Sequence, residues 1–184
     1  IDQKRMKFEL EEMEIEPLIK TMISELTPQA NARNLHLKYE NPSGVLPLVQ
    51  IDKIRFQEVL GNLISNAIKF TESGGVTIKT LTREDHIRID CIDTGIGIPE
   101  EKQKDIFKKF FQLNSSTSSQ QKGTGLGLYI SKMITEKMGG RISVSSAPER
   151  GTDIFFTVPI AKTPLAKRAV DVVKKEALAN PSQK

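Results

Sequence analysis

Hydrophobic residues recur along this chain with two different periods, which predicts a protein that contains both helices and strands. A spacing of three to four residues, typical of helices with one buried face, predicts helices over 17–26, 52–70, 100–110 and 126–138. Pro17 suits the first turn of the first helix, and Asp52 is a suitable N-cap for the second. Gly139 and Gly140 follow the fourth, as glycines commonly do at helix C-termini.

A spacing of two residues, typical of strands, predicts strands over 6–10, 35–39, 76–81, 87–92, 141–147 and 153–159. Turns are expected at 83–86 and 148–151, and a glycine-rich loop at 93–99. Because helices and strands do not alternate strictly, a doubly wound nucleotide-binding fold is disfavoured. We expect an α/β two-layer sandwich, in which three helices cover one face of a mixed, mostly antiparallel sheet.

Two segments lack this patterning. Residues 114–122 are mainly Ser, Thr and Gln, so they can bury little surface and are predicted to be mobile. Residues 165–179 could form an amphipathic helix, but the pattern that builds a core ends by Pro159.

Charge and cysteine usage exclude several classes of function. The net charge of +4 arises in residues 161–184, so the rest of the chain is neutral and a basic nucleic-acid-binding face is not expected. Cys91 is the only cysteine, and His36 and His86 are the only histidines, which excludes a disulfide framework and a zinc site built from this chain. No apolar run is long enough to cross a bilayer, so no membrane contact is expected.

Three polar residues share one face of the helix predicted over 52–70. Asn62, Asn66 and Lys69 are spaced i, i+4 and i+7, which places them one above another. Amide oxygens can coordinate a hard cation such as Mg²⁺, and a lysine on the same face can contact phosphate. Taken alone, the stripe can be explained equally well without a ligand, as two asparagines that lie between packed helices and a lysine at the surface.

The loop over 93–99 directly follows an apolar strand. Gly95 and Gly97 allow the backbone to approach a ligand closely, and the Asp93 carboxylate could accept a hydrogen bond from an exocyclic amine. Such a contact would select adenine over guanine, which carries a carbonyl oxygen at that position. The same D-x-G-x-G pattern also occurs in ordinary turns.

A cluster of glycines, Gly123, Gly125 and Gly127, lies at the start of the helix predicted over 126–138. Glycines at this place expose backbone N–H groups at the positive end of the helix dipole, where phosphates bind. The pattern does not match a P-loop. It resembles the dinucleotide-binding fingerprint only loosely, because its helix follows a polar loop rather than a strand.

Together these segments resemble the ordered motifs of the histidine kinase family, within the superfamily of gyrase-type and heat-shock-chaperone ATPases. The N box, first glycine box, F box and second glycine box correspond to 52–71, 93–98, 106–113 and 123–128. Gly151 and Thr152, before a strand that ends at Pro159, resemble the closing G-T-x-F-x-F-x-x-P pattern. The resemblance spans roughly residues 1–160 and implies a Bergerat-type ATP-binding fold.

The resemblance also implies a site for ATP and Mg²⁺. Asn66 would be the Mg²⁺ ligand, Asn62 would support the metal or a phosphate, and Lys69 would lie near the phosphates. Asp93 would bind the adenine amine, with Thr152 beside the adenine. The other implied contacts to the base and phosphates are Gly95, Gly97, Ile98, Lys122, Gly123, Thr124, Gly125, Leu126, Gly127 and Leu128.

The F box departs from the family pattern. Lys108 and Lys109 stand where a Glu-Pro pair is common, and Gln112 stands where many relatives have an arginine that faces phosphate. Gln112 is therefore not assigned a phosphate contact. Residues 112–122 are implied as the ATP lid.

Position 62 indicates which reaction of the superfamily to expect. In the hydrolytic branches a Glu lies one turn before the metal-binding Asn and acts as general base for water. This chain has Asn62 there, which cannot accept a proton, and Glu58 lies about 6 Å further along the helix axis. We therefore expect a protein-histidine kinase of a two-component system. The alternatives are a hydrolytic ATPase and a degenerate module that binds nucleotide or protein.

The resemblance implies that the acceptor histidine lies on a separate helical hairpin domain, upstream of Ile1. His36, in a strand-like context, and His86, in a turn, are expected to be structural. Residues 1–14 are expected to be the end of that dimerisation and phosphoacceptor hairpin with its linker. Residues 15–160 are expected to form the catalytic ATP-binding domain, and residues 161–184 a basic tail. The chain lacks an initial Met and is expected to be part of a longer dimeric kinase, whose other partner is a response regulator receiver domain. The expected location is the cytoplasm, whether or not the parent is anchored in the inner membrane.

Overall fold

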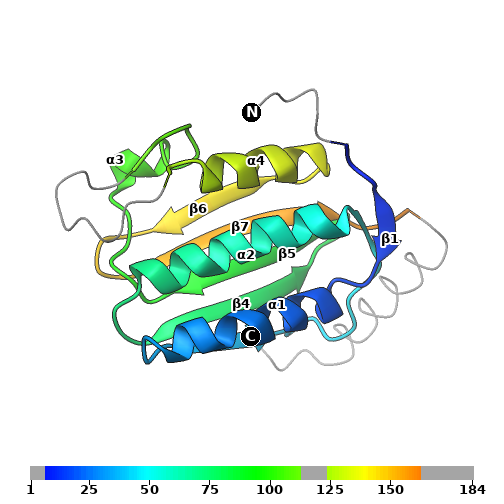
Figure 1. Ribbon diagram of the computed structural model, residues 1–184. Helices are drawn as coiled ribbons and strands as arrows, with labels where there is room; N and C mark the ends of the chain where they lie inside the picture. The colour runs from blue at the N-terminus through cyan, green and yellow to red at the C-terminus, as the bar shows by residue number, and fades with distance from the viewer. Residues whose placement is uncertain (1–6, 113–123, 163–184) are drawn as a thin grey trace.

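The computed structural model describes residues 7–112 and 124–162, which build a five-stranded sheet with helices on one face (Figure 1). In chain order the elements are β1 (Glu11–Met13), α1 (Glu16–Asn31), β2 (His36–Glu40), β3 (Val49–Ile51), α2 (Lys53–Phe70), β4 (Gly75–Thr82), β5 (His86–Asp93), α3 (Glu100–Gln103), α4 (Gly127–Lys137), β6 (Ile142–Ser146) and β7 (Thr152–Pro159). The strand order is β2-β4-β5-β7-β6, in which β2 and β4 are parallel and the other neighbours antiparallel. The mixed, mostly antiparallel sheet expected from the sequence is confirmed.

Helices α1, α2 and α4 lie across one face of the sheet, with α2 in the middle (Figure 1). Helix α1 packs on β2, α2 on β4 and β5, and α4 on β6 and β7. The strands alternate accordingly: in β5, Ile87, Ile89 and Cys91 are buried in the core under the helices, whereas Arg88 points to the opposite face. This is the α/β two-layer sandwich with three helices on one face that the sequence predicts.

Helix α2 is the central helix and carries the candidate polar stripe. Its N-cap is Asp52, whose Oδ1 accepts a hydrogen bond from the Arg55 backbone N–H at 3.0 Å, as expected. The buried residues of α2 are Phe56, Val59, Leu60, Leu63, Ile64, Ala67 and Ile68. Burial of this apolar face sets the rotation of the helix about its axis, and the amides of Asn62 and Asn66 consequently lie on the side next to α4.

The strand expected over 6–10 is wrong in position. Phe8 and Leu10 belong to no strand, and Met6 lies outside the described residues. The strand in this part of the chain is β1, which pairs antiparallel with β3. Strand β3 was not predicted, because three residues are too few to show an alternation. Both strands exist because each is the other's partner, with Glu11 opposite Ile51.

The helix expected over 100–110 is also shorter than predicted, since α3 ends at Gln103. Phe110 has a φ of +61°, which a right-handed helix does not allow, and its backbone N–H donates to Gly125 O at 2.9 Å. A contact with the second glycine box therefore replaces a helical hydrogen bond. The helix expected over 126–138 is confirmed as α4.

Some expectations fall on residues that the structure does not describe. These are the stretch 114–122, the lid 112–122 apart from Gln112, the helix over 165–179 and the end of the implied hairpin over 1–6. Within the two described ranges, none of the helices combines the length and the apolar character needed to cross a membrane.

Candidate functional site

Asn62, Asn66 and Lys69 of α2 are half-buried, and the two asparagines form a hydrogen-bonded pair. Asn62 Nδ2 donates to Ser131 Oγ on α4 at 2.9 Å, and Asn66 Nδ2 donates to Asn62 Oδ1 at 3.4 Å. Lys69 lies at the last turn of the helix, with Nζ 5.1 Å from the centroid of the Phe70 ring. Because both donors point inwards, the carbonyl oxygen of Asn66 is the atom of this pair that can meet a ligand; no described residue donates to it.

Helix α4 begins within the second glycine box, directly against Asn62. A Cβ on Gly127 would overlap Asn62 Oδ1, so glycine is required for the first turn of α4 to approach the amide this closely. Gly125, with a φ of +67°, accepts the hydrogen bond from Phe110 described above. The second glycine box is thus connected on one side to the N box and on the other to the F box.

The remaining residues of this motif are placed only in part. Leu126 N lies 3.4 Å from Thr124 Oγ1, to which it donates, and Leu128 packs half-buried against the hydrophobic core. Lys122 and Gly123 lie outside the described residues.

Asp93 ends β5 and is held by two backbone donors. Its Oδ1 accepts hydrogen bonds from Gly95 N at 2.8 Å and from Thr152 N at 3.1 Å, because Asp93 and Thr152 are paired across β5 and β7. Only 9 % of Asp93 is exposed. Burial raises the pKa of Asp93 above its usual range, and the two backbone hydrogen bonds partly oppose this rise. Oδ2, to which no described residue donates, is the atom free to accept from a ligand.

The rest of the loop after Asp93 is fixed against the turn between β6 and β7. Gly97 has a φ of +72°, and a Cβ there would overlap the carbonyl oxygen of Ala147. The backbone N–H of Ile98, a buried residue, donates to Ser146 Oγ at 2.8 Å, and that hydroxyl donates to Gly151 O at 2.7 Å. Ser146 therefore joins the loop to the turn. This role of Ser146 was not predicted, because the last residue of a strand carries no local signal for such a contact.

The Asp93 loop meets the C-terminal end of α2. The backbone N–H of Ile96 donates to Phe70 O at 3.4 Å, so the loop lies next to the turn of α2 that carries Lys69. Around α2 the structure thus brings together the candidate adenine-binding residues on one side and the second glycine box on another.

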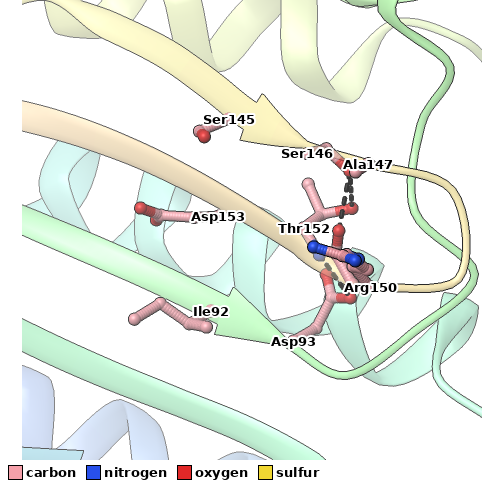
Figure 2. Close-up of a pocket in the computed structure, with 9 residues that line it drawn as sticks. Ile92, Asp93, Ser145, Ser146, Ala147, Arg150, Thr152 and Asp153 are labelled. Atoms are coloured by element: carbon pink, nitrogen blue, oxygen red, sulfur yellow. Dashed lines mark hydrogen bonds between the residues drawn. The ribbon is translucent and has the colours of Figure 1, made fainter.

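An open hollow of about 270 Å³ lies at the ends of β5, β6 and β7 (Figure 2). It is lined by Ile92, Asp93, Ser145, Ser146, Ala147, Arg150, Gly151, Thr152 and Asp153. Hydrogen bonds join Asp93 to Thr152, and Thr152 to Ser146, at its edge (Figure 2). Asn62 and Asn66 do not line the hollow, so it reaches the candidate adenine-binding residues and not the candidate metal ligands.

The donor atoms of the site fit a hard cation held by few protein ligands. Among residues 7–112 and 124–162, no group of three or more His, Cys, Asp or Glu could hold a metal ion. An amide oxygen such as that of Asn66 suits Mg²⁺, which binds through one or two protein oxygens and completes its octahedron with waters and phosphate oxygens.

Comparison with known proteins agrees with the motifs. The chain is 37 % identical over 180 residues to the sensor histidine kinase GacS of Pseudomonas protegens, covering 88 % of this chain and 19 % of that protein. The chain therefore spans about a fifth of the length of this relative.

Several solved structures with a similar arrangement are histidine kinases. Full-length ShkA in complex with AMPPNP superposes with a TM-score of 0.75 at 28 % identity, covering 87 % of this chain and 33 % of ShkA. The catalytic domain of ThkA gives a TM-score of 0.72 at 30 % identity, covering 83 % of this chain and 96 % of that domain. ThkA in complex with the response regulator protein TrrA gives 0.68 at 26 % identity, covering 84 % of this chain and 42 % of ThkA.

The model of one protein family, described as histidine kinase-, DNA gyrase B- and HSP90-like ATPase, matches residues 51–162. This match covers more than half of the chain and includes α2, the Asp93 loop and the second glycine box. It confirms the resemblance inferred from the motifs. The chain belongs to the family of histidine kinase-, DNA gyrase B- and HSP90-like ATPases.

Proposed function

We propose that this chain binds Mg²⁺-ATP and transfers the γ-phosphoryl group to a histidine on a separate helical hairpin domain of the same kinase, in two-component signal transduction. The bond between the γ-phosphorus and its bridging oxygen breaks, a phosphorus–nitrogen bond to the histidine forms, and ADP leaves. Catalysis of this kind depends mainly on positioning and on stabilising the charge of the transferring group.

The choice of reaction rests on the residues of α2 that precede Asn66. The residue one turn earlier is Asn62, whose amide is hydrogen-bonded to Ser131 and cannot act as a base. The single carboxylate of α2 is Glu58, and it accepts a hydrogen bond from Arg55 at 2.6 Å. Because water activation would need a free base near the metal, transfer to an incoming histidine is favoured over hydrolysis.

The residues of the site have separate proposed roles. Asn66 would hold Mg²⁺ through its carbonyl oxygen, while Asn62 would support it and Lys69 would lie near the phosphates. When bound, Mg²⁺ would neutralise phosphate charge during transfer. Asp93 Oδ2 would accept from the adenine amine, with Thr152 beside the base. The other proposed contacts are Gly95, Gly97, Ile98, Lys122, Gly123, Thr124, Gly125, Leu126, Gly127 and Leu128.

We propose two protein partners, the dimerisation and phosphoacceptor hairpin of the parent kinase and a response regulator receiver domain. The complex of ThkA with TrrA, and the name of GacS, support this assignment by similarity. A cytoplasmic location fits the proposed role, since both partners act where ATP is available. Nucleic acid is not a proposed partner, because the domain outside the tail is neutral.

Labelled ATP tests the proposed reaction. The chain is incubated with Mg²⁺ and ATP labelled in the γ-phosphate, alone and with a purified phosphoacceptor hairpin of a GacS-like kinase. We expect label on the hairpin and none on the chain itself. Label on His36 or His86 would contradict the proposal.

Two further outcomes would favour the alternatives. Steady release of phosphate from the chain alone would indicate a hydrolytic ATPase. A folded chain that binds no Mg²⁺-ATP in calorimetry would indicate a degenerate binding module.

A further inference from the structure

A buried hydroxyl on α4 touches the asparagine pair of α2. Ser131 is 1 % exposed, and its Oγ lies 2.9 Å from Asn62 Nδ2. It lies one turn after Gly127, which packs against the oxygen of the same amide. The Asn62 amide is therefore held against two successive turns of α4, its nitrogen at Ser131 and its oxygen at Gly127.

These contacts form a chain of hydrogen bonds with one direction. Asn66 Nδ2 donates to Asn62 Oδ1, and Asn62 Nδ2 donates to Ser131 Oγ. If the Asn62 amide were reversed, its nitrogen would face Asn66, and Asn66 would have to turn its oxygen inwards to accept. Its NH₂ group would then face the site and repel a cation. The direction of the chain thus decides whether Asn66 presents an oxygen to the metal.

We propose that Ser131 is a positioning residue, which accepts a hydrogen bond from Asn62 and thereby orients Asn66 so that its carbonyl oxygen faces Mg²⁺. This inference rests on the proposed function, because it concerns the metal of Mg²⁺-ATP. Ser131 itself touches neither metal nor nucleotide. Its contribution should appear in the dependence of nucleotide binding on Mg²⁺ and not in binding of the adenine.

The same helix offers a matched control. Thr135 lies one turn further along α4, is fully buried, and its hydroxyl makes no hydrogen bond with a described residue. Thr135→Val removes a buried hydroxyl from the same helix without changing the shape of the side chain. An effect of Ser131→Ala that Thr135→Val does not share is therefore due to the contact with Asn62.

Two measurements by calorimetry test the proposal. The first titrates Mg²⁺ at a fixed concentration of ATP, and the second measures ATP binding in EDTA. For Ser131→Ala we expect the half-saturating Mg²⁺ concentration to rise about two- to tenfold, the range for one neutral hydrogen bond, with ATP binding in EDTA unchanged. Thr135→Val should match the wild type in both measurements. An unchanged Mg²⁺ requirement, or equal weakening with and without Mg²⁺, would overturn the proposal.

A double-mutant cycle shows whether Ser131 acts through Asn62. In the Asn62→Ala background, Ser131→Ala should have no further effect on the Mg²⁺ requirement, because the link to Asn66 is already missing. A full additional effect in that background would refute the proposed route.

The nucleotide-free chain provides a readout that does not depend on the proposed function. In a ¹⁵N–¹H spectrum, the side-chain NH₂ resonances of Asn62 should shift in Ser131→Ala and stay in place in Thr135→Val. If the wild-type chain bound no ATP but these shifts occurred, the proposed function would fail while the contact stood. Unmoved resonances would overturn the inference about Ser131.

Discussion

At the scale of single residues, the site depends on which atom each polar side chain turns inwards. Asp93 uses Oδ1 for two backbone donors and leaves Oδ2 for a ligand. Asn66 donates a hydrogen bond through Nδ2 to its neighbour Asn62 and leaves Oδ1 for a ligand. In both cases, hydrogen bonds within the protein engage one of the two polar atoms of a planar side-chain group. The direction in which the other atom points is therefore set before any ligand binds.

Asn66→Ala tests the proposed metal ligand. The loss of the amide oxygen should weaken Mg²⁺-dependent ATP binding at least about tenfold, the effect expected for a hydrogen bond or contact with a charged partner. Calorimetry with Mg²⁺ measures the change. Gln57→Ala removes another half-buried amide from α2, one that contacts Met22, and should leave binding unchanged. Equal affinities for Asn66→Ala and the wild type would show that Asn66 does not hold the metal.

Asp93→Asn tests adenine recognition without removing the structural acceptor. The Asn oxygen can still accept from Gly95 and Thr152, whereas an NH₂ group replaces Oδ2 and cannot accept from the adenine amine. ATP affinity should fall about tenfold or more, and GTP, which has a carbonyl oxygen there, should gain relative to ATP. Competition between the two nucleotides measures this ratio. If the ratio of the ATP and GTP affinities does not change, Asp93 does not contact the base.

At the scale of secondary-structure elements, α2 is attached to the N-terminal segment of the described chain. Asp52 Oδ1 caps the helix at Arg55 N, and its Oδ2 accepts from Glu9 N at 3.0 Å. Burial raises the pKa of Asp52, but hydrogen bonds from Glu9, Arg55 and Ile54 outweigh this effect, so the pKa lies below its usual value. The Asp52 carboxylate therefore both caps the helix of the site and holds the segment that precedes β1 to it.

Variants of Asp52 separate these two roles. Asp52→Ala should lower the free energy of unfolding by about 1–2 kcal/mol, since a helix cap is lost. Asp52→Asn keeps an oxygen for Arg55 but not for Glu9, so its loss should be smaller. Urea unfolding at neutral pH measures both. The lowered pKa means that the contribution of Asp52 is present above about pH 4 and is lost as the pH falls further. Identical losses for the two variants would show that the Arg55 cap contributes nothing, and no loss in Asp52→Asn would show the same of the Glu9 contact.

At the scale of the whole molecule, the strand order places a charged network on the sheet face opposite the helices. Because β5 and β7 are neighbours, Arg88 contacts Asp90 on its own strand and Asp153 on the next, the latter at 3.0 Å. The guanidinium also stacks 3.6 Å from the ring centroid of Phe155. Burial and the charge of Asp90 raise the pKa of Asp153 to about 6, although Arg88 opposes the rise.

This raised pKa predicts a pH dependence of stability. The contribution of a carboxyl whose pKa is higher in the folded state is full below about pH 4 and is lost as the pH rises through about 6. Asp153→Asn carries no charge, so at pH 7.5 it should melt a few degrees above the wild type, and the difference should shrink at pH 5. Thermal melts at both values measure it. Asp105→Asn, at a half-exposed carboxylate paired with Lys108, is the control and should show no such trend. A constant difference between pH 5 and 7.5 would contradict the assignment.

Much of the fold could be predicted because its signals are local. The apolar period and N-cap of α2, and the alternation in β4, β5 and β7, depend on residues close together in the chain. The ordered motifs then identified the family. Where a segment's conformation depends on a distant partner, the prediction was wrong: β1 forms by pairing with β3, and Phe110, expected to be helical, instead bonds to Gly125.

The sequence by itself determined the kind of sheet, the helix that carries Asn62 and Asn66, and the family, because periodicity, caps and motifs are properties of short segments. Only the tertiary structure decided which atoms face the site. The contacts of Asn62 with Ser131, of Asp93 with Thr152 and of Ile98 with Ser146 join segments that are far apart in the chain. Ser131 alone carried a weak signal, as a polar residue one turn after Gly127 on a helix with an apolar face. Such contacts depend on how helices and strands pack, and packing is set by the whole core rather than by any local pattern.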